Sequence, residues 1–338
     1  MKTFSFDLLG QAFDVACETD AMIEPLRGLI GEWETRPSSD HAMAPDRPTL
    51  EISMVGGQDI VRPEHETTIF EGKIVEEGPF ILAQGEAGWS VTAPGEVAVR
   101  FSDNDTRAEM VISPQCRQSL LGVTSSFALD HAVTQSGLCI AHAACMETPD
   151  ASSRLLLHAP SGTGKTTTAI ALIDMGYRLS SDDATILSPG RDGTTNANGI
   201  PRALKVHRKT GNMFDWLSRL VANGDWDSNG EQWVHRARLA EHGYLAEKTP
   251  KPVSAVIALA RTDGPMLFAK EPSGAEALWR MLDDNINLGP NGLLPGNENR
   301  LNLFSNMLVT TPAYRLEING SPQQAARTIH EALKKTVG

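Results

Sequence analysis

Apolar and polar positions alternate in short runs between Thr49 and about Ile112, and each run is bounded by Gly, Pro or Asp. Alternation with a period of two is typical of strands that bury one face, and the bounding residues favour turns. The pattern therefore predicts a meander of strands in a mostly antiparallel sheet. The expected strands include Leu50–Met54, Thr67–Phe70, Phe80–Ala83, Trp89–Ala93 and Val97–Phe101.

Other elements are expected on either side of this meander. A strand at Thr3–Leu8 precedes an amphipathic helix over about Ala21–Trp33, and a flexible, proline-rich loop follows at Arg36–Pro48. Apolar residues that share one face predict another helix over Gln115–Ala132. We therefore expect a strand-rich α+β domain over residues 1–134, with a junction near Thr134–Gly137.

Beyond this junction, strand and helix patterns alternate, which predicts an α/β domain over residues 135–338. One long polar segment, Ser188–Gly199, is rich in Gly, Asn, Thr and Asp and is expected to be a loop. The expected strands are Leu138–Cys145, Arg154–His158, Arg178–Ser181, Ala184–Leu187 and Val253–Ala260, and the expected helices are Thr166–Met175, Ala275–Asn285 and Ala325–Thr336.

Composition narrows the classes of function. The 338 residues carry 30 Lys and Arg against 42 Asp and Glu, a formal charge of −12, which argues against a dedicated duplex nucleic-acid or anionic-membrane binder. No run is apolar and long enough to span a bilayer, and the first twenty residues lack the pattern of a signal peptide. The four cysteines form no CxxC pair. We expect a cytoplasmic, reduced protein.

The most specific motif is Ala159–Thr166, which fits GxxxxGK[ST] with Ala at the first position. Phosphate binding needs several backbone N–H groups directed at one anion, and Gly162 and Gly164 permit that close approach. Lys165 supplies a charge for the β- and γ-phosphates, and the Thr166 hydroxyl can ligate Mg²⁺. The predicted nucleotide contacts are Ser161, Gly162, Thr163, Gly164, Lys165, Thr166 and Thr167.

Two adjacent acids, Asp182 and Asp183, follow the expected strand Arg178–Ser181. We expect that strand to lie beside the strand leading into the phosphate turn, so that both acids face the phosphates. One carboxylate can then join the Mg²⁺ shell while the other accepts a proton from an attacking hydroxyl. The alternative is a solvated turn that happens to contain two acids.

The sequence SGTGKTTTAIALIDMGYRLSSDDATIL resembles the kinase core of HPr kinase/phosphorylase, the bacterial enzyme that phosphorylates a serine on a small carrier protein. The spacing from Lys165 to Asp182 agrees without a gap. The resemblance implies a P-loop fold and a kinase activity that depends on ATP and Mg²⁺. It also implies a catalytic set of Lys165, His142, Asp182 and Asp183. It implies Thr166 and Asp183 as metal contacts, and it leaves open which acid is the base.

The second signature of that family, a Glu and an Arg beside glycines, is replaced here by Gly199–Lys205. The layout is more similar to HPr kinase-related proteins encoded with peptide-tailoring enzymes, including kinases of the C-terminal serine of lasso-peptide precursors. This resemblance implies a peptide or small protein as partner and leaves homo-oligomerisation open. The alternatives are an HPr-type carrier kinase or phosphorylase, a non-catalytic nucleotide sensor and a small-molecule kinase.

Further residues have a structural and a functional interpretation. His158 is expected to be structural. Arg202 and Lys205 either reach a γ-phosphate or an acidic peptide end, or belong to a solvated turn, and Arg300 is a candidate transition-state arginine. The basic stretch Trp233–Lys251 is expected to be a solvated helix face. The tryptophans expected to pack in a core are Trp216, Trp226 and Trp233.

Overall fold

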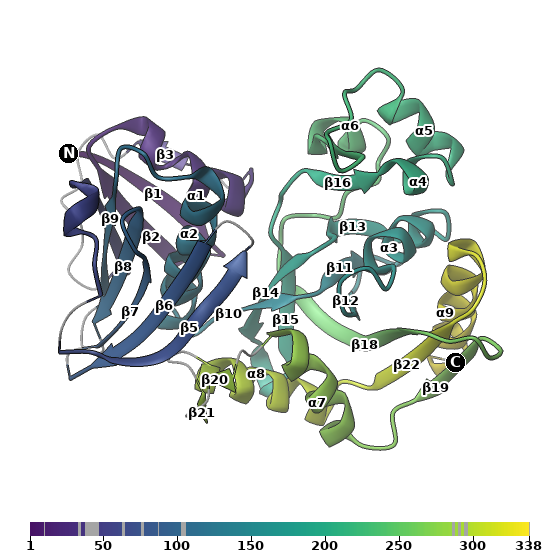
Figure 1. The fold of residues 1–338 in the computed structure, drawn as a ribbon. Coiled ribbons are helices and arrows are strands. Elements are labelled where there is room, and N and C mark those ends of the chain that lie inside the picture. Colours follow the sequence, from purple (N-terminus) through teal and green to yellow (C-terminus); the bar gives the residue numbers. More distant parts are fainter. Residues whose placement is uncertain are drawn as a thin grey trace. The chain divides into compact units, whose positions relative to one another are not determined.

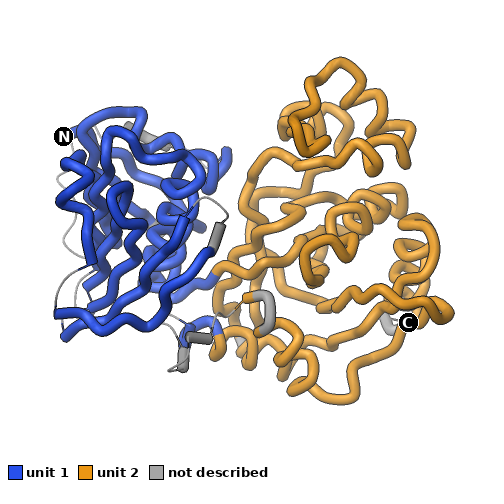
Figure 2. Tube along the Cα trace, viewed as in Figure 1, with its two compact units in different colours: residues 1–139, 286–300 blue, residues 140–285, 301–338 orange. Residues whose placement is uncertain are grey.

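The chain forms two compact units that are described separately (Figure 2). The first is Met1–Cys139 with Ile286–Arg300, and the second is Ile140–Asn285 with Leu301–Gly338. Both contain sheets with packed helices, so the predicted α/β class is confirmed. The computed structural model describes residues 1–9, 11–32, 35–37, 47–62, 65–75, 78–86, 88–102, 106–285, 288–289, 292–293 and 297–337.

The first unit is built on a nine-stranded sheet with the order β3-β1-β2-β4-β9-β8-β7-β6-β5 (Figure 1). Strands β5 to β9 form the predicted antiparallel meander, whereas β4 pairs in parallel with both β2 and β9. The bounds are β1 Lys2–Leu8, β2 Gln11–Cys17, β3 Thr35–Pro37, β4 Thr49–Met54, β5 Thr67–Val75, β6 Gly78–Gly85, β7 Gly88–Ala93, β8 Val97–Ser102 and β9 Arg107–Ile112.

Two helices, α1 (Glu24–Ile30) and α2 (Gln118–Gln135), pack on each other, and α2 packs on the sheet. The rings of Trp89 and Phe101 stack with centroids 4.1 Å apart and meet His131 of α2. Strand β2 was not predicted from the sequence. The loop predicted over Arg36–Pro48 is wrong at its start, because residues 36–37 belong to β3, and its residues 38–46, like Trp33, lie outside the described residues. The short elements of this unit are η1 Asp20–Met22, η2 Gly57–Asp59, β20 Leu288–Gly289 and β21 Gly292–Leu293.

The second unit contains a mixed sheet with the order β10-β14-β15-β18-β12-β11-β13, extended by β22 on β18 and β19 on β22. Helices α3 (Lys165–Ile173) and α9 (Pro322–Val337) pack against each other, and both contact strands of this sheet (Figure 1). The strand bounds are β10 Cys139–His142, β11 Ala144–Glu147, β12 Arg154–His158, β13 Arg178–Ser181, β14 Ala184–Pro189, β15 Thr195–Gly199, β16 Leu204–His207, β17 Glu231–Val234, β18 Lys251–Arg261, β19 Leu267–Lys270 and β22 Ala313–Ile318.

The predicted helices of this unit are present as α3, α7 and α9, with bounds that differ by a few residues. Helix α3 starts at Lys165, and the basic stretch Trp233–Lys251 contains one short helix between two strands, so the prediction of a helix along it is wrong. The bounds are α3 Lys165–Ile173, η3 Arg191–Gly193, α4 Arg208–Gly211, α5 Asp215–Val221, α6 Arg236–Ala240, α7 Gly274–Asn285, α8 Asn297–Thr310, which the unit boundary divides, and α9 Pro322–Val337.

Two sequence predictions are corrected here. The strand expected over Leu138–Cys145 is two strands, β10 and β11, which are separated at Ala143. The loop expected over Ser188–Gly199 is the turn and second strand of a hairpin, because β15 pairs with β14 and with β18. Its polar residues are satisfied inside the sheet: the Asn198 amide donates to the Lys248 carbonyl at 3.2 Å.

A buried charge cluster fixes the strand that leads into the phosphate turn. The side chains of Arg154 on β12 and Glu147 on β11 are both 0 % exposed and meet at 2.8 Å. Lys251 also donates to Glu147 at 2.7 Å, and Arg154 donates to the carbonyls of Glu247 and Thr249. Pairing and additional hydrogen bonds are what a buried charge requires.

All four cysteines are free thiols, and burial raises the pKa of Cys139 to about 12 and that of Cys145 to about 11. These two thiols therefore stay protonated at neutral pH.

Among the helices in the described part of the chain, none combines the length and apolar character needed to cross a membrane.

Candidate nucleotide-binding site

The turn between β12 and α3 has the backbone geometry that its glycines permit. Gly162 and Gly164 have φ values of 77° and 116°, a region that residues with side chains rarely adopt. Gly164 is the N-cap of α3, and the Thr163 N–H donates to the Pro160 carbonyl at 3.2 Å. The free N–H groups of the first turn of α3, with its positive dipole end, therefore suit an anion.

Three side chains from separate elements meet at this turn. The ammonium of Lys165 lies 3.2 Å from Asp183 Oδ1, and Nε2 of His142, at the end of β10, lies 2.9 Å from the same oxygen. Lys165 is buried, whereas more than half of the Asp183 side chain is exposed. The structure thus brings together three of the four predicted catalytic residues.

The fourth, Asp182, is buried beside the start of α3. The Thr166 hydroxyl donates to Asp182 Oδ2 at 3.4 Å. Burial, with the charge of Asp183 as a second cause, raises the pKa of Asp182 to about 7. Burial also raises the pKa of Asp183, but the hydrogen bond from His142 and the charge of Lys165 outweigh it and hold that pKa well below its usual value. Adjacent carboxyls with separated pKa values can take different roles.

The position of the acid pair in the sheet differs from the prediction. Strand β13, which ends just before Asp182, pairs with β11 and not with the phosphate-turn strand β12. The reason is that β11 and β12 form an antiparallel hairpin, with Ala144 opposite Leu157, and β11 occupies the edge of β12 that β13 was expected to use. The acids still reach Lys165 and Thr166 from one strand further away.

These groups line a pocket of about 370 Å³. Thr163 is not among its described lining residues, although it was a predicted contact. The lining also includes His207 and Glu231, which the sequence analysis missed because neither stands in a recognisable motif. The lining residues are His142, Pro160, Ser161, Gly162, Gly164, Lys165, Thr166, Thr167, Asp182, Asp183, Arg202, Ala203, Lys205, His207, Glu231 and Trp233.

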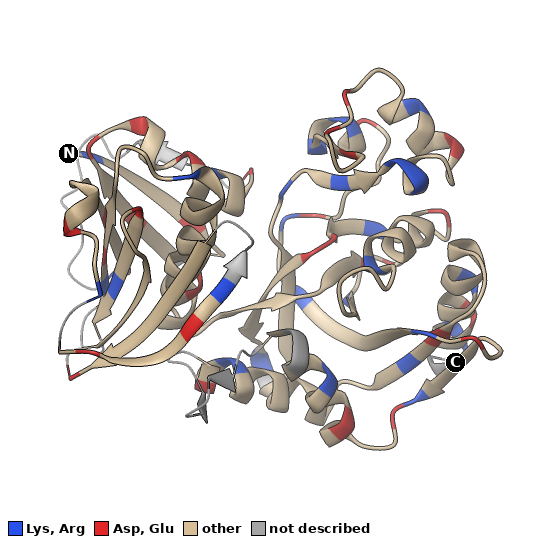
Figure 3. Ribbon diagram, in the orientation of Figure 1, with Lys and Arg blue, Asp and Glu red and all other residues tan. Residues whose placement is uncertain are grey.

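Arg202 and Lys205 also line this pocket. Burial lowers the pKa of Arg202, and the charges of Asp183 and Asp182 oppose that shift, so the guanidinium lies near both acids. Lys205 pairs with Glu231, which also meets Nε2 of His207 at 3.1 Å. Elsewhere, Lys and Arg are interspersed with Asp and Glu in both units (Figure 3). The lining of the pocket thus includes Lys165, Arg202 and Lys205, cations of the kind that bind phosphate groups.

Other predicted candidates lie elsewhere or have structural contacts. Arg300 belongs to the first unit, where it pairs with Asp130 and donates to Asn297 Oδ1 at 2.6 Å. His158 is buried and lies 2.7 Å from the Arg280 carbonyl, as expected of a structural residue. Trp216 and Trp226 pack against the core. Trp233 is 54 % exposed, so the prediction of core packing is wrong for it.

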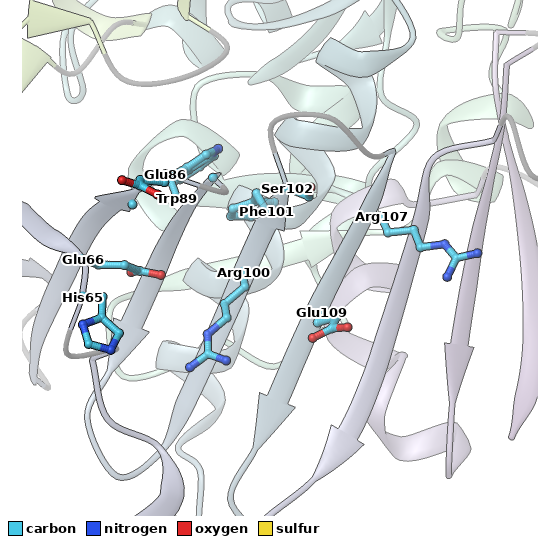
Figure 4. A pocket seen from close by; sticks show the side chains of 11 residues that line it. His65, Glu66, Glu86, Trp89, Arg100, Phe101, Ser102, Arg107 and Glu109 are labelled. Carbon is cyan, nitrogen blue, oxygen red and sulfur yellow. The ribbon is translucent and has the colours of Figure 1, made fainter.

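The first unit has a pocket of its own, of about 900 Å³. Arg100 on β8 and Glu109 on β9 are direct cross-strand neighbours there, and Figure 4 shows their side chains near each other. The Ser90 hydroxyl donates to Glu66 at the same site. The pocket therefore offers charges of both signs. Its lining residues are His65, Glu66, Gly85, Glu86, Gly88, Trp89, Arg100, Phe101, Ser102, Arg107 and Glu109.

Comparisons with known proteins add one likeness. No protein-family model matches the sequence, and no curated protein matches it. Among solved structures, the Hpr(Ser) kinase/phosphatase from Coxiella burnetii is similar, with a TM-score of 0.31 and 15 % sequence identity, over 59 % of this chain and 99 % of that one. This TM-score and this sequence identity are too low to indicate the chemistry of the site, which depends on the residues of the pocket.

Proposed function

We propose that this protein is an ATP- and Mg²⁺-dependent kinase that transfers the γ-phosphate to a serine hydroxyl of a peptide or protein. One observation carries the proposal: Lys165 and Thr166, at the N-terminus of α3, share a pocket of about 370 Å³ with two carboxyls of separated pKa. A phosphate turn alone would serve a nucleotide sensor. An acid pair beside it provides groups for an acceptor hydroxyl and a metal.

The residues fit Mg²⁺, which prefers oxygen ligands and is usually held by one or two carboxylates together with substrate phosphates. Thr166 and Asp182 supply such oxygens, 3.4 Å apart. Burial and the charge of Asp183 raise the pKa of Asp182 although the charge of Lys165 opposes the shift, so its ionised form would gain from a bound cation. We therefore propose Thr166 and Asp182 as the metal ligands, whereas the family resemblance implies Thr166 and Asp183. When bound, Mg²⁺ would neutralise charge on the β- and γ-phosphate oxygens.

The remaining groups act on the acceptor and the transferred phosphoryl group. Asp183 is ionised at neutral pH and orients the serine hydroxyl, whose oxygen attacks the γ-phosphorus while its proton passes to the carboxylate. His142, 2.9 Å from that carboxylate, fixes its direction. The bond from the γ-phosphorus to the bridging oxygen breaks, ADP leaves, and Lys165 neutralises charge developing on the phosphate oxygens.

The acceptor is proposed from sequence resemblance to the peptide-tailoring kinases: the C-terminal serine of a lasso-type precursor. The pocket of the first unit supports a peptide partner, because its Arg100 and Glu109 offer charges of both signs. ATP is a cytoplasmic nucleotide, so the proposal includes a cytoplasmic location.

The test is incubation of the full chain with labelled ATP, Mg²⁺ and a matched set of acceptors. The set contains a peptide ending in serine, the same peptide ending in alanine, an HPr-type carrier protein and free serine. We expect label on the peptide that ends in serine alone. Label on the carrier protein would favour the carrier kinase, label on free serine a small-molecule kinase, and nucleotide binding without transfer a sensor.

Gly199→Ala is expected to disturb the acid pair from a neighbouring strand. A Cβ on Gly199 would lie 2.4 Å from the Ser180 carbonyl carbon and 2.4 Å from Ser181 Cβ, so the backbone leading to Asp182 must move. We expect transfer to fall about 10²-fold and the free energy of unfolding to fall by about 1–3 kcal/mol. Transfer assays and urea unfolding measure these effects. Gly122→Ala is the control, because its Cβ meets no atom within 4 Å; equal activity of the two variants would contradict the argument.

A further inference from the structure

The hairpin of β16 and β17 presents an aromatic and charged face to the phosphate pocket. Lys205 is directly opposite Trp233, and His207 is opposite Glu231, so the four side chains share one face. The Lys205 ammonium lies 5.7 Å from the centroid of a Trp233 ring. All four residues line the pocket that contains Lys165. An indole that is 54 % exposed contributes little to the core, so packing does not explain its place here.

The pocket has two distinguishable ends. Thr166 and Thr167, successive residues at the start of α3, point in different directions, as helix geometry requires. Thr166 donates to Asp182, whereas Thr167 Oγ1 lies 3.0 Å from Thr210 Oγ1 on α4. Helix α4 follows β16 directly, so the end of the hairpin at His207 lies on the Thr167 side of α3. The acid pair thus marks one end. The hairpin begins beside that end, after Arg202, with Lys205 and Trp233, and its other pair, His207 and Glu231, lies toward the Thr167 end.

This arrangement gives a bound nucleotide a direction. If the γ-phosphate lies near Lys165 and the acids, the nucleoside must extend away from them, along the hairpin face. We propose that Trp233 is the stacking platform for the base of the nucleotide, with a purine favoured because it offers the larger π surface. This inference rests on the proposed function, since it takes the site to bind a nucleoside triphosphate.

The charged side chains around Trp233 suit a nucleotide base better than a simple anion. Glu231 is largely buried and holds both Lys205 and His207, so donors and an acceptor are fixed around the indole. A purine edge carries both donors and acceptors, which such a set can match. Stacking on an aromatic side chain accounts for roughly 5- to 150-fold in affinity per base.

The experiment compares ligands with and without a base. Calorimetric titration of the full chain with Mg²⁺ measures the Kd of a non-hydrolysable ATP analogue and of tripolyphosphate, for wild type and Trp233→Ala. We expect Trp233→Ala to weaken the analogue roughly 5- to 150-fold and to leave tripolyphosphate unchanged, while Trp233→Phe retains most of the affinity. Trp279→Ala is the matched control, because Trp279 is 66 % exposed on α7 and does not line the pocket as described.

The outcomes separate this inference from the proposed function. Unchanged affinity of Trp233→Ala for the analogue, with wild type binding both ligands, overturns the platform and leaves the kinase intact. A raised KM for the acceptor peptide with unchanged nucleotide affinity also overturns it, because the indole then serves the acceptor. Equal weakening of analogue and tripolyphosphate overturns it as well. Wild type that binds neither ligand overturns the proposed function itself.

Discussion

Replacing Lys165 by Met is expected to lower phosphate transfer about 10²- to 10³-fold, the cost of removing one charged donor from a developing anion. The Lys165 side chain is 8 % exposed and its ammonium lies 3.2 Å from Asp183 Oδ1, so water cannot readily take its place. Met retains the apolar stem and removes only the charge. Single-turnover transfer to the serine peptide measures the effect.

The fold should survive this change, because His142 still donates to Asp183 when the ammonium is gone. Thermal unfolding and circular dichroism check this point. Lys270→Met is the control, since Lys270 is an exposed residue of β19 away from the pocket lining. Wild-type transfer by Lys165→Met would mean that the phosphate lies elsewhere, and the site assignment would fail.

The parts of the site that the sequence predicts are contiguous in the chain. The turn from Ala159 to Thr166 requires particular residue types at fixed spacing, because phosphate must approach the backbone, and the structure has the left-handed glycines that this needs. The acids at Asp182 and Asp183 follow at a set distance. The meander between Thr49 and Ile112 is equally local, because each hairpin is set by alternation and a turn.

The parts that the sequence did not predict depend on contacts between distant segments. The insertion of β11 between β12 and β13 follows from strand pairing, which residue patterns do not encode locally. Strand β15 was taken for a loop, because Asn198 is polar and its partner, the Lys248 carbonyl, lies 50 residues further on. For the same reason, the sequence did not reveal the buried pair of Glu147 and Arg154. It also gave the wrong prediction for Trp233, which is exposed and not packed in the core.

The difference between the two acids is also invisible in the sequence, where they are neighbours of the same type. Burial separates them: Asp182 is 7 % exposed and has its pKa raised to about 7, whereas Asp183 meets His142 and Lys165 and has its pKa lowered. The proposed mechanism uses this difference when it gives the metal to Asp182 and the acceptor to Asp183.

Asp182→Asn is expected to stabilise the nucleotide-free protein at pH 8 while abolishing most of its activity. The pKa of Asp182 rises from 3.8 in the unfolded chain to about 7 in the folded protein, so the folded state binds the proton more tightly. Wild type therefore loses stability as pH rises from about 4 to about 7, by on the order of 4 kcal/mol for a shift of about three units. Asn carries no such charge and avoids this loss.

Urea unfolding of both proteins between pH 5 and 8.5, without nucleotide or metal, measures the difference, which should grow with pH. Added Mg²⁺ should raise the midpoint of wild type at pH 8 and leave Asp182→Asn almost unchanged, because a cation offsets the buried charge. Asp183→Asn is the control of opposite sign, since a carboxyl with a lowered pKa stabilises the fold at neutral pH. Parallel pH profiles for wild type and Asp182→Asn would show that Asp182 does not ionise at a cost in the folded protein, and the metal would then have to be assigned to other oxygens.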